Sequence, residues 1–132
     1  MNAVRIPNIV AIGESARLLH AIDHAARQSY PGVDVLTLLP DELDAESLKA
    51  WQVRPPHVAF LEWRPGRENI LARLRRDETL PQLPIWLMVR PGESPGFDGL
   101  HVSGSLRVHA EMEQLEAQLR TLMDFLKICI YP

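Results

Sequence analysis

Short apolar runs alternate with helix-like segments along the whole of this 132-residue sequence. Short apolar runs bounded by turns are typical of buried parallel strands, because helices cover both faces of a parallel sheet. The alternation therefore predicts an α/β fold, a flavodoxin-like doubly wound sheet of five parallel strands. The expected strands span residues 8–12, 33–39, 58–61, 85–89 and 102–108.

The segments between these runs carry apolar residues at three- and four-residue steps, which is the spacing of an amphipathic helix. Ser15 is placed to cap the first helix, and Pro31 and Gly32 follow its expected end. The later helices are expected over residues 44–51, 67–76 and 111–126.

Regularity lapses between residues 90 and 99, which include two prolines and three glycines. Both residue types are unfavourable inside a helix. A doubly wound sheet of this kind has a helix here, so we expect that fourth helix to be short or absent. The helix over residues 111–126 is then the fifth.

Length and composition limit the class of protein. A chain of 132 residues with 46% hydrophobic residues is sufficient for one domain, residues 1–132, and too short for two. The net charge of −3 disfavours direct nucleic-acid binding. The single cysteine, Cys129, rules out an internal disulfide, and no apolar segment approaches the ~18 residues of a membrane span. We expect a cytoplasmic protein with no membrane contact.

The segment from residue 56 to 89 carries a family resemblance, and the likeness extends more weakly over residues 8–123. The chain resembles the receiver domain of bacterial two-component response regulators. The residues that follow the order usual in that family are Pro56-x-x-x-x-Leu61-Glu62, Pro65-Gly66, Leu71-x-x-Leu74-Arg75-x-Asp77 and Leu83-Pro84-Ile85.

The resemblance implies a phosphorylation pocket in which several family residues are missing. Receivers have two acidic residues after the first strand, a phosphoacceptor aspartate ending the third, a hydroxyl residue ending the fourth and a lysine ending the fifth. Here the acidic pair falls on Gly13 and Glu14, and the acceptor falls on Glu62. The hydroxyl and lysine positions fall on Val89 and Val108.

These replacements predict a pseudo-receiver that takes no phosphoryl group and has no enzymatic activity. The loop after Glu62 is one residue shorter than usual, so an alternative register puts Leu61 at the acceptor position. No cation is expected to meet phosphoryl charge, and Glu62 is either a solvated carboxylate or a mimic of phosphoaspartate. No cofactor or selective metal site is expected, although weak Mg²⁺ binding by Glu14 and Glu62 stays open.

The histidines and serines suggest no catalytic site. His20 and His24 lie four residues apart on the first helix, yet no third ligand follows at a zinc-binding spacing. Ser103 and Ser105 lack the Gly-x-Ser-x-Gly pattern of a nucleophile elbow.

The predicted function is a phosphorylation-independent protein-interaction module in bacterial signal transduction or transcriptional regulation. Its expected partners are proteins, including a second copy bound through helix five. The alternative is a small-ligand sensor that binds at the carboxyl ends of the strands. The sequence leaves open the partner, the oligomeric state and whether an effector domain follows residue 132. The candidate interface residues are Trp63, Phe97, Met112, Met123 and Phe125.

Overall fold

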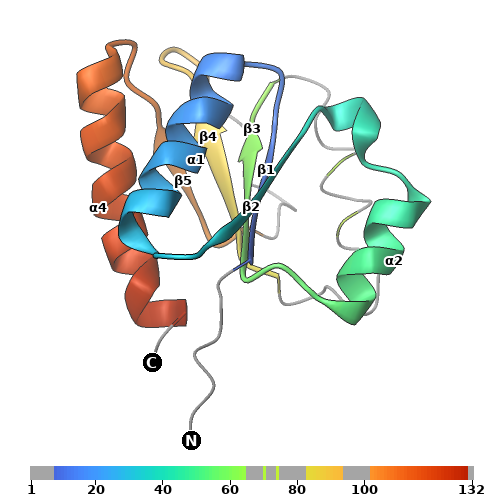
Figure 1. Ribbon diagram of the computed structural model, residues 1–132. Helices are drawn as coiled ribbons and strands as arrows, with labels where there is room; N and C mark the ends of the chain where they lie inside the picture. The colour runs from blue at the N-terminus through green and yellow to red at the C-terminus, as the bar shows by residue number, and fades with distance from the viewer. Residues whose placement is uncertain (1–7, 65–69, 71–73, 75–82, 94–101, 131–132) are drawn as a thin grey trace, which may run out of the picture.

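Five parallel strands form one sheet in the order β2-β1-β3-β4-β5. The computed structural model describes residues 8–64, 70, 74, 83–93 and 102–130 (Figure 1). The sheet confirms the predicted fold class, and each strand lies within one residue of an expected apolar run or inside it. The strands are β1 (Asn8–Ile12), β2 (Asp34–Leu38), β3 (Val58–Glu62), β4 (Ile85–Val89) and β5 (Gly104–Arg107).

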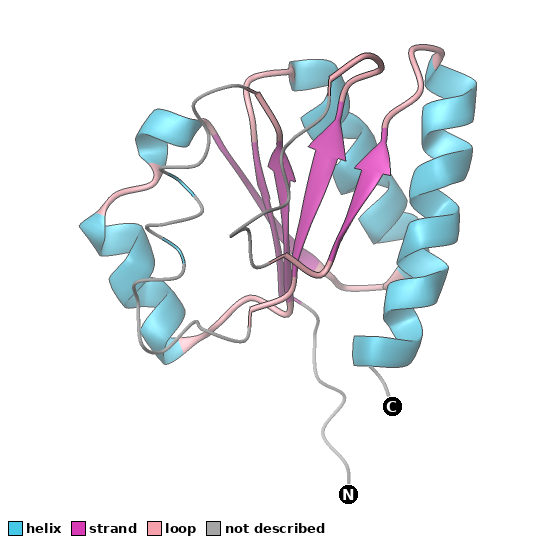
Figure 2. Ribbon diagram, turned by 180° about the vertical axis from the view of Figure 1, so that it is seen from behind, coloured by secondary structure: helices cyan, strands magenta, loops and turns pink. Residues whose placement is uncertain are grey.

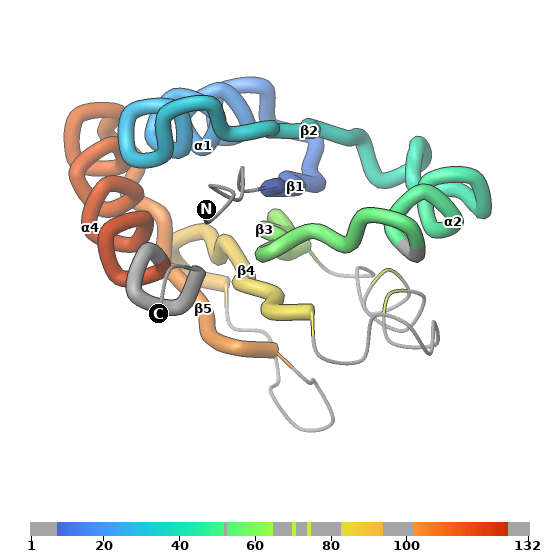
Figure 3. Tube along the Cα trace, turned by 60° about the horizontal axis from the view of Figure 1, so that its bottom comes forward, coloured from blue at the N-terminus to red at the C-terminus, as the bar shows by residue number. Residues whose placement is uncertain are grey.

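Helices cover both faces of this sheet. In Figures 1 and 3, α1 and α4 lie together on one side of the strands and α2 lies on the other. Figure 2 shows the same layers from behind. The helix expected as the fifth is α4. The helices are α1 (Ala16–Ser29), α2 (Ala45–Val53) and α4 (Met112–Ile130), with a short 3-10 helix η1 (Pro40–Glu42).

Strand alternation divides the core into two clusters. Val58 and Phe60 of β3 pack with α1 and α4, whereas Ala59 and Leu61 pack on the opposite face with Trp51 of α2. All five residues of β3 are buried, as expected for a central strand covered on both faces. If this alternation continues past the end of β3, successive side chains there also point to opposite faces of the sheet.

Local chemistry determines where α1 begins and ends. The Ser15 hydroxyl accepts a hydrogen bond from the Leu18 amide at 3.2 Å, as an N-cap does. At the other end, Gly32 has a φ of +80°, a left-handed conformation that suits glycine. Buried Tyr30 donates a hydrogen bond from its hydroxyl to the Met123 carbonyl, which joins α1 to α4.

Two expected helices fall partly or wholly in segments that the structure does not describe. Of the helix predicted over residues 67–76, only Ile70 and Leu74 are described; both are helical and buried. The predicted shortening or loss of the fourth helix concerns residues 90–99, most of which lie outside the described residues. In the described part of the chain, no helix is both long and apolar enough to cross a membrane.

Candidate functional site

The carboxylate of Glu62 lies at the carboxyl edge of the sheet and is almost completely enclosed. The residue is 3% exposed, so the expectation of a solvated carboxylate is wrong. Glu62 ends the central strand β3, and the loop after β1, with Gly13 and Glu14, lies beside it. A buried carboxylate needs compensating donors, because removing a charge from water is costly.

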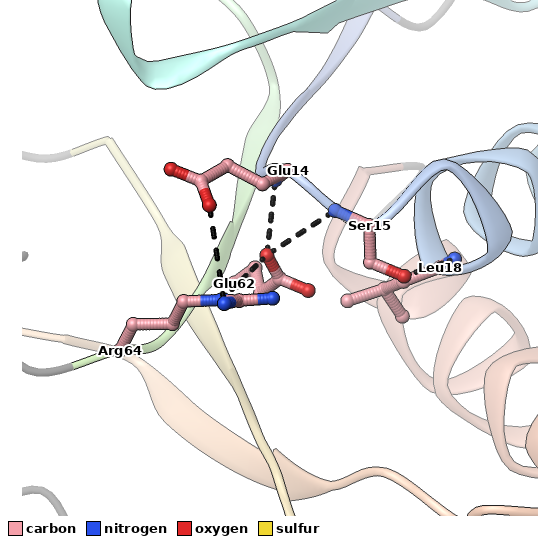
Figure 4. A network of polar contacts seen from close by, with 5 residues as sticks. All are labelled: Glu14, Ser15, Leu18, Glu62 and Arg64. Atoms are coloured by element: carbon pink, nitrogen blue, oxygen red, sulfur yellow. Dashed lines mark hydrogen bonds and ion pairs between the residues drawn. The ribbon is translucent and has the colours of Figure 1, made fainter.

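Backbone amides at the start of α1 supply those donors. Glu62 Oε1 accepts hydrogen bonds from the Glu14 amide at 2.9 Å and from the Ser15 amide at 3.4 Å (Figure 4). These amides immediately precede the first turn of α1, where the helix dipole favours negative charge. Glu62 therefore places its own carboxylate where an external anion would bind.

Arg64 supplies a positive charge at the same place. Its Nε lies 3.4 Å from Glu62 Oε1, and its Nη1 lies 3.9 Å from Glu14 Oε2 (Figure 4). The prediction that no cation remains in this pocket is therefore wrong. Residues two apart along an extended strand point to the same face, so the spacing of Glu62 and Arg64 was the signal in the sequence.

Gly13 permits this arrangement by leaving space for Glu62. A Cβ atom on Gly13 would lie 2.8 Å from Glu62 Cβ and 3.4 Å from its Oε1. Real Cβ atoms essentially never approach a neighbour this closely. A larger residue after β1 would push Glu62 away from its amide donors.

The two valines at the hydroxyl and lysine positions also lie at the carboxyl edge. Val89 ends β4 and is 3% exposed, packed in the core, whereas Val108 directly follows β5 and is half-buried. The Val108 amide donates a hydrogen bond to the Val89 carbonyl at 2.8 Å. These two side chains therefore offer neither a hydroxyl nor an amine to an anion.

A cavity of about 240 Å³ opens beside Glu62, between the start of α1, the end of β4 and the β5–α4 loop. Sequence reasoning missed the basic residues Arg17 and Arg90, which line it together with His109. Arg17 crosses from α1 to the loop before α4 by donating a hydrogen bond to the Ala110 carbonyl. Its other lining residues are Ser15, Leu18, Glu62, Met88, Pro91, Val108, Ala110 and Leu115.

The candidate interface residues differ in exposure. Trp63 is 5% exposed and Met123 is fully buried, so neither can present a surface, and their prediction as interface residues is wrong. Trp63 follows Glu62 by one residue and therefore points to the opposite face, into the core cluster with Trp51. Phe125 is 54% exposed, Met112 is half-buried against the core, and Phe97 lies outside the described residues.

Phe125 contacts a second aromatic residue, Trp86 of β4, the strand next to the edge strand β5. Its ring meets that of Trp86 edge to face, with centroids 6.2 Å apart at an interplanar angle of 75°. Trp86 lies against Gly104 of the edge strand β5, where a Cβ atom would come within 2.7 Å of the indole. Phe125 is thus the exposed end of a packed aromatic pair.

Within the described ranges, no group of three or more histidine, cysteine, aspartate or glutamate side chains is placed to hold a metal ion. His20 and His24 stack along α1 with ring centroids 6.4 Å apart. Both are on the exposed face of the helix.

Several solved structures share this architecture. The phosphorylated cyanobacterial phytochrome response regulator RcpA has a TM-score of 0.69 and 20% identity, over 92% of this chain and 94% of that chain. A response regulator receiver domain from Rhodospirillum rubrum has a TM-score of 0.70 and 13% identity over the same shares. The chemotaxis response regulator CheY4 of Vibrio cholerae has a TM-score of 0.65 and 17% identity, over 89% of this chain and 99% of that chain.

The similarity is one of structure. No protein-family model and no curated protein sequence matches the chain. At 13–20% identity, these likenesses show the fold of a response regulator receiver domain. The role of the pocket has to be argued from its own residues.

Proposed function

We propose that this chain is a pseudo-receiver, a cytoplasmic protein-interaction module of bacterial signal transduction or transcriptional regulation that works without phosphorylation. One observation carries the proposal: the buried Glu62 carboxylate is bound by two amides of the α1 start and contacted by Arg64. The Glu62 carboxylate thus accepts the hydrogen bonds of the amides at the start of α1, and no phosphoryl group is needed as their acceptor.

The surrounding residues also disfavour phosphotransfer chemistry. Transfer to a carboxylate is helped by cations that neutralise the charge on the phosphoryl oxygens. Arg64 already contacts both carboxylates that would hold Mg²⁺, Glu14 and Glu62. The side chains of Val89 and Val108 add no donor. These features support a site without catalytic activity and make Mg²⁺ a weak competitor of the Arg64 guanidinium.

A phosphorylation assay tests this proposal. The purified chain is incubated with acetyl phosphate and Mg²⁺, and intact-mass spectrometry measures any added phosphoryl group, with a phosphorylatable receiver as positive control. We expect no added mass. A phosphorylated species that disappears in Glu62→Gln would overturn the proposal, because it would identify Glu62 as a working acceptor.

The surface around Phe125 is our candidate for the protein contact, including a homodimer through α4. A 54% exposed phenylalanine beside Trp86 of β4 offers apolar area on the surface of α4. Exposed aromatic residues often contribute strongly to interfaces. Sedimentation of wild type and Phe125→Ser over a range of concentrations tests the homodimer. A wild-type chain that stays monomeric throughout would contradict it.

A second function is favoured by the cavity beside Glu62. In doubly wound folds, ligands bind beyond the carboxyl ends of the strands, which is where this cavity of about 240 Å³ lies. Small-ligand sensing is compatible with a pseudo-receiver, because a ligand can replace phosphorylation as the signal. A thermal-shift screen of metabolites in which none stabilises the chain would count against sensing.

A further inference from the structure

One oxygen of the Glu62 carboxylate is left for a ligand. Both hydrogen bonds and the closest Arg64 contact are made by Oε1, and no described residue donates to Oε2. In Figure 4, this second oxygen points away from Glu14, toward the side where Ser15 and Leu18 stand. Ser15, Leu18 and Glu62 all line the cavity. The cavity therefore contains a carboxylate oxygen of a residue that is 3% exposed, and no described residue donates a hydrogen bond to that oxygen.

Positive charge lines another part of the same cavity. Arg17 and Arg90 both border it, and both are exposed enough to remain hydrated. Arg17 uses part of its guanidinium on the Ala110 carbonyl, which holds the side chain across the cavity. A guanidinium has five N–H donors in a fork that matches a carboxylate, so further donors remain for a bound anion.

The remaining wall is apolar and the volume is small. Leu18, Met88, Val108 and Leu115 contribute apolar side chains to the lining. Sites for drug-sized ligands begin at roughly 300 Å³, so a cavity of about 240 Å³ suits a smaller metabolite.

We infer that this cavity binds a free α-amino acid with a short apolar side chain. Its ammonium group would donate to Glu62 Oε2, its carboxylate would bind Arg17 and Arg90, and its side chain would contact Leu18 and Met88. A simple anion would be repelled by Glu62, and a simple amine would leave the arginines without a partner. The inference rests on the ligand-sensing function and gives it a ligand class.

Isothermal titration with L-leucine tests this assignment, using the intact chain without Mg²⁺ or phosphodonor. Isoamylamine lacks the carboxylate, N-acetyl-leucine lacks the ammonium, and 2-hydroxyisocaproate replaces the amine with a hydroxyl. We expect leucine or valine to bind with a Kd below ~1 mM, and each analogue to bind at least ~10-fold more weakly, the usual loss for one charge-assisted hydrogen bond. Absence of binding by every apolar amino acid tried would overturn the inference.

Substitutions of the lining residues test whether leucine binds in this cavity. Arg90→Gln and Arg17→Gln should each weaken leucine binding at least ~10-fold, because each removes a charged donor. Arg120→Gln is the matched control: it is an exposed arginine of α4 that does not line the cavity. Leucine affinity unchanged in both cavity variants would overturn the inference. Glu62→Gln should also weaken leucine binding. If the Glu62→Gln variant fails to fold, the two arginine variants still test the inference.

The binding test and the phosphorylation test have separate readouts. If leucine does not bind, the assignment of an amino-acid ligand is overturned, but the prediction that the chain is not phosphorylated still stands. Conversely, a phosphorylated Glu62 would overturn the pseudo-receiver even if leucine binds.

Discussion

Gly13 and Glu62 lie so close together that a methyl group on the Gly13 α-carbon would come within 2.8 Å of Glu62 Cβ. The contact joins the ends of β1 and β3 at the point where the buried carboxylate meets the start of α1. In the sequence, Gly13 looked like the loss of an acidic residue. The close contact gives a steric reason for a glycine at this position.

Gly13→Ala should therefore destabilise the chain. The added methyl group must displace Glu62 or the β1–α1 loop, and overpacking of this kind costs about 1–3 kcal/mol. Urea unfolding followed by circular dichroism measures the change. Ser105→Ala, at an exposed position of β5, should stay within about 0.5 kcal/mol of wild type. Equal stability of Gly13→Ala and wild type would show that the close contact relaxes freely.

Arg64→Gln should lower stability more than loss of a surface ion pair does. Arg64 is 31% exposed and contacts a carboxylate that is 3% exposed, so its removal leaves Glu62 with backbone donors alone. We expect a loss of about 1–2 kcal/mol, less than for a fully buried pair because water reaches the guanidinium.

Arg54→Gln is the matched control for this comparison. It breaks the Arg54–Asp34 pair, whose nitrogen and oxygen are 2.8 Å apart but whose side chains are 55% and 59% exposed. Exposed pairs contribute about 0–1 kcal/mol. Urea midpoints that fall equally in the two variants would contradict a special role for Arg64.

The fold was predictable because its signals are local. The apolar runs of β1 and β4 and the Ser15 cap of α1 are each contained in a few consecutive residues. Parallel strands buried on both faces leave little alternative for such runs.

The site was less predictable because its contacts are distant in sequence. Glu62 accepts hydrogen bonds from amides 48 and 47 positions away, so its burial could not be seen from neighbouring residues. Trp63 was misjudged for a related reason. It follows the end of β3, yet strand alternation continues for one more residue and directs the indole into the core.

Trp63→Ala and Phe125→Ala should therefore differ sharply in stability. Trp63 is 5% exposed, and truncation of a buried aromatic residue costs about 3–5 kcal/mol. Phe125 is 54% exposed, so its truncation should cost about 1 kcal/mol, mainly from the edge contact with Trp86. Thermal unfolding of both variants checks this order, and a reversed order would restore Trp63 as a surface residue.

Glu62→Asp restores the residue that receivers carry at this position, and we expect it to gain no phosphorylation. The shorter side chain withdraws the carboxylate from the Glu14 and Ser15 amides by about one C–C bond. A misplacement near 1 Å can cost on the order of 100-fold in rate. Val108 would still offer no amine to the phosphoryl oxygens. Incubation with acetyl phosphate and Mg²⁺ followed by intact-mass spectrometry should show only the unmodified chain.

The matched comparison is Glu62→Asp combined with Val108→Lys, which restores the cation position as well. Val108 is half-buried beside the same cavity, so a lysine there has an exit to solvent. Phosphorylation of the double variant alone would show that the missing lysine is what prevents phosphotransfer. Phosphorylation of Glu62→Asp alone would instead mean that Glu62 is the only obstacle, and that Arg64 and Val108 are compatible with a working acceptor.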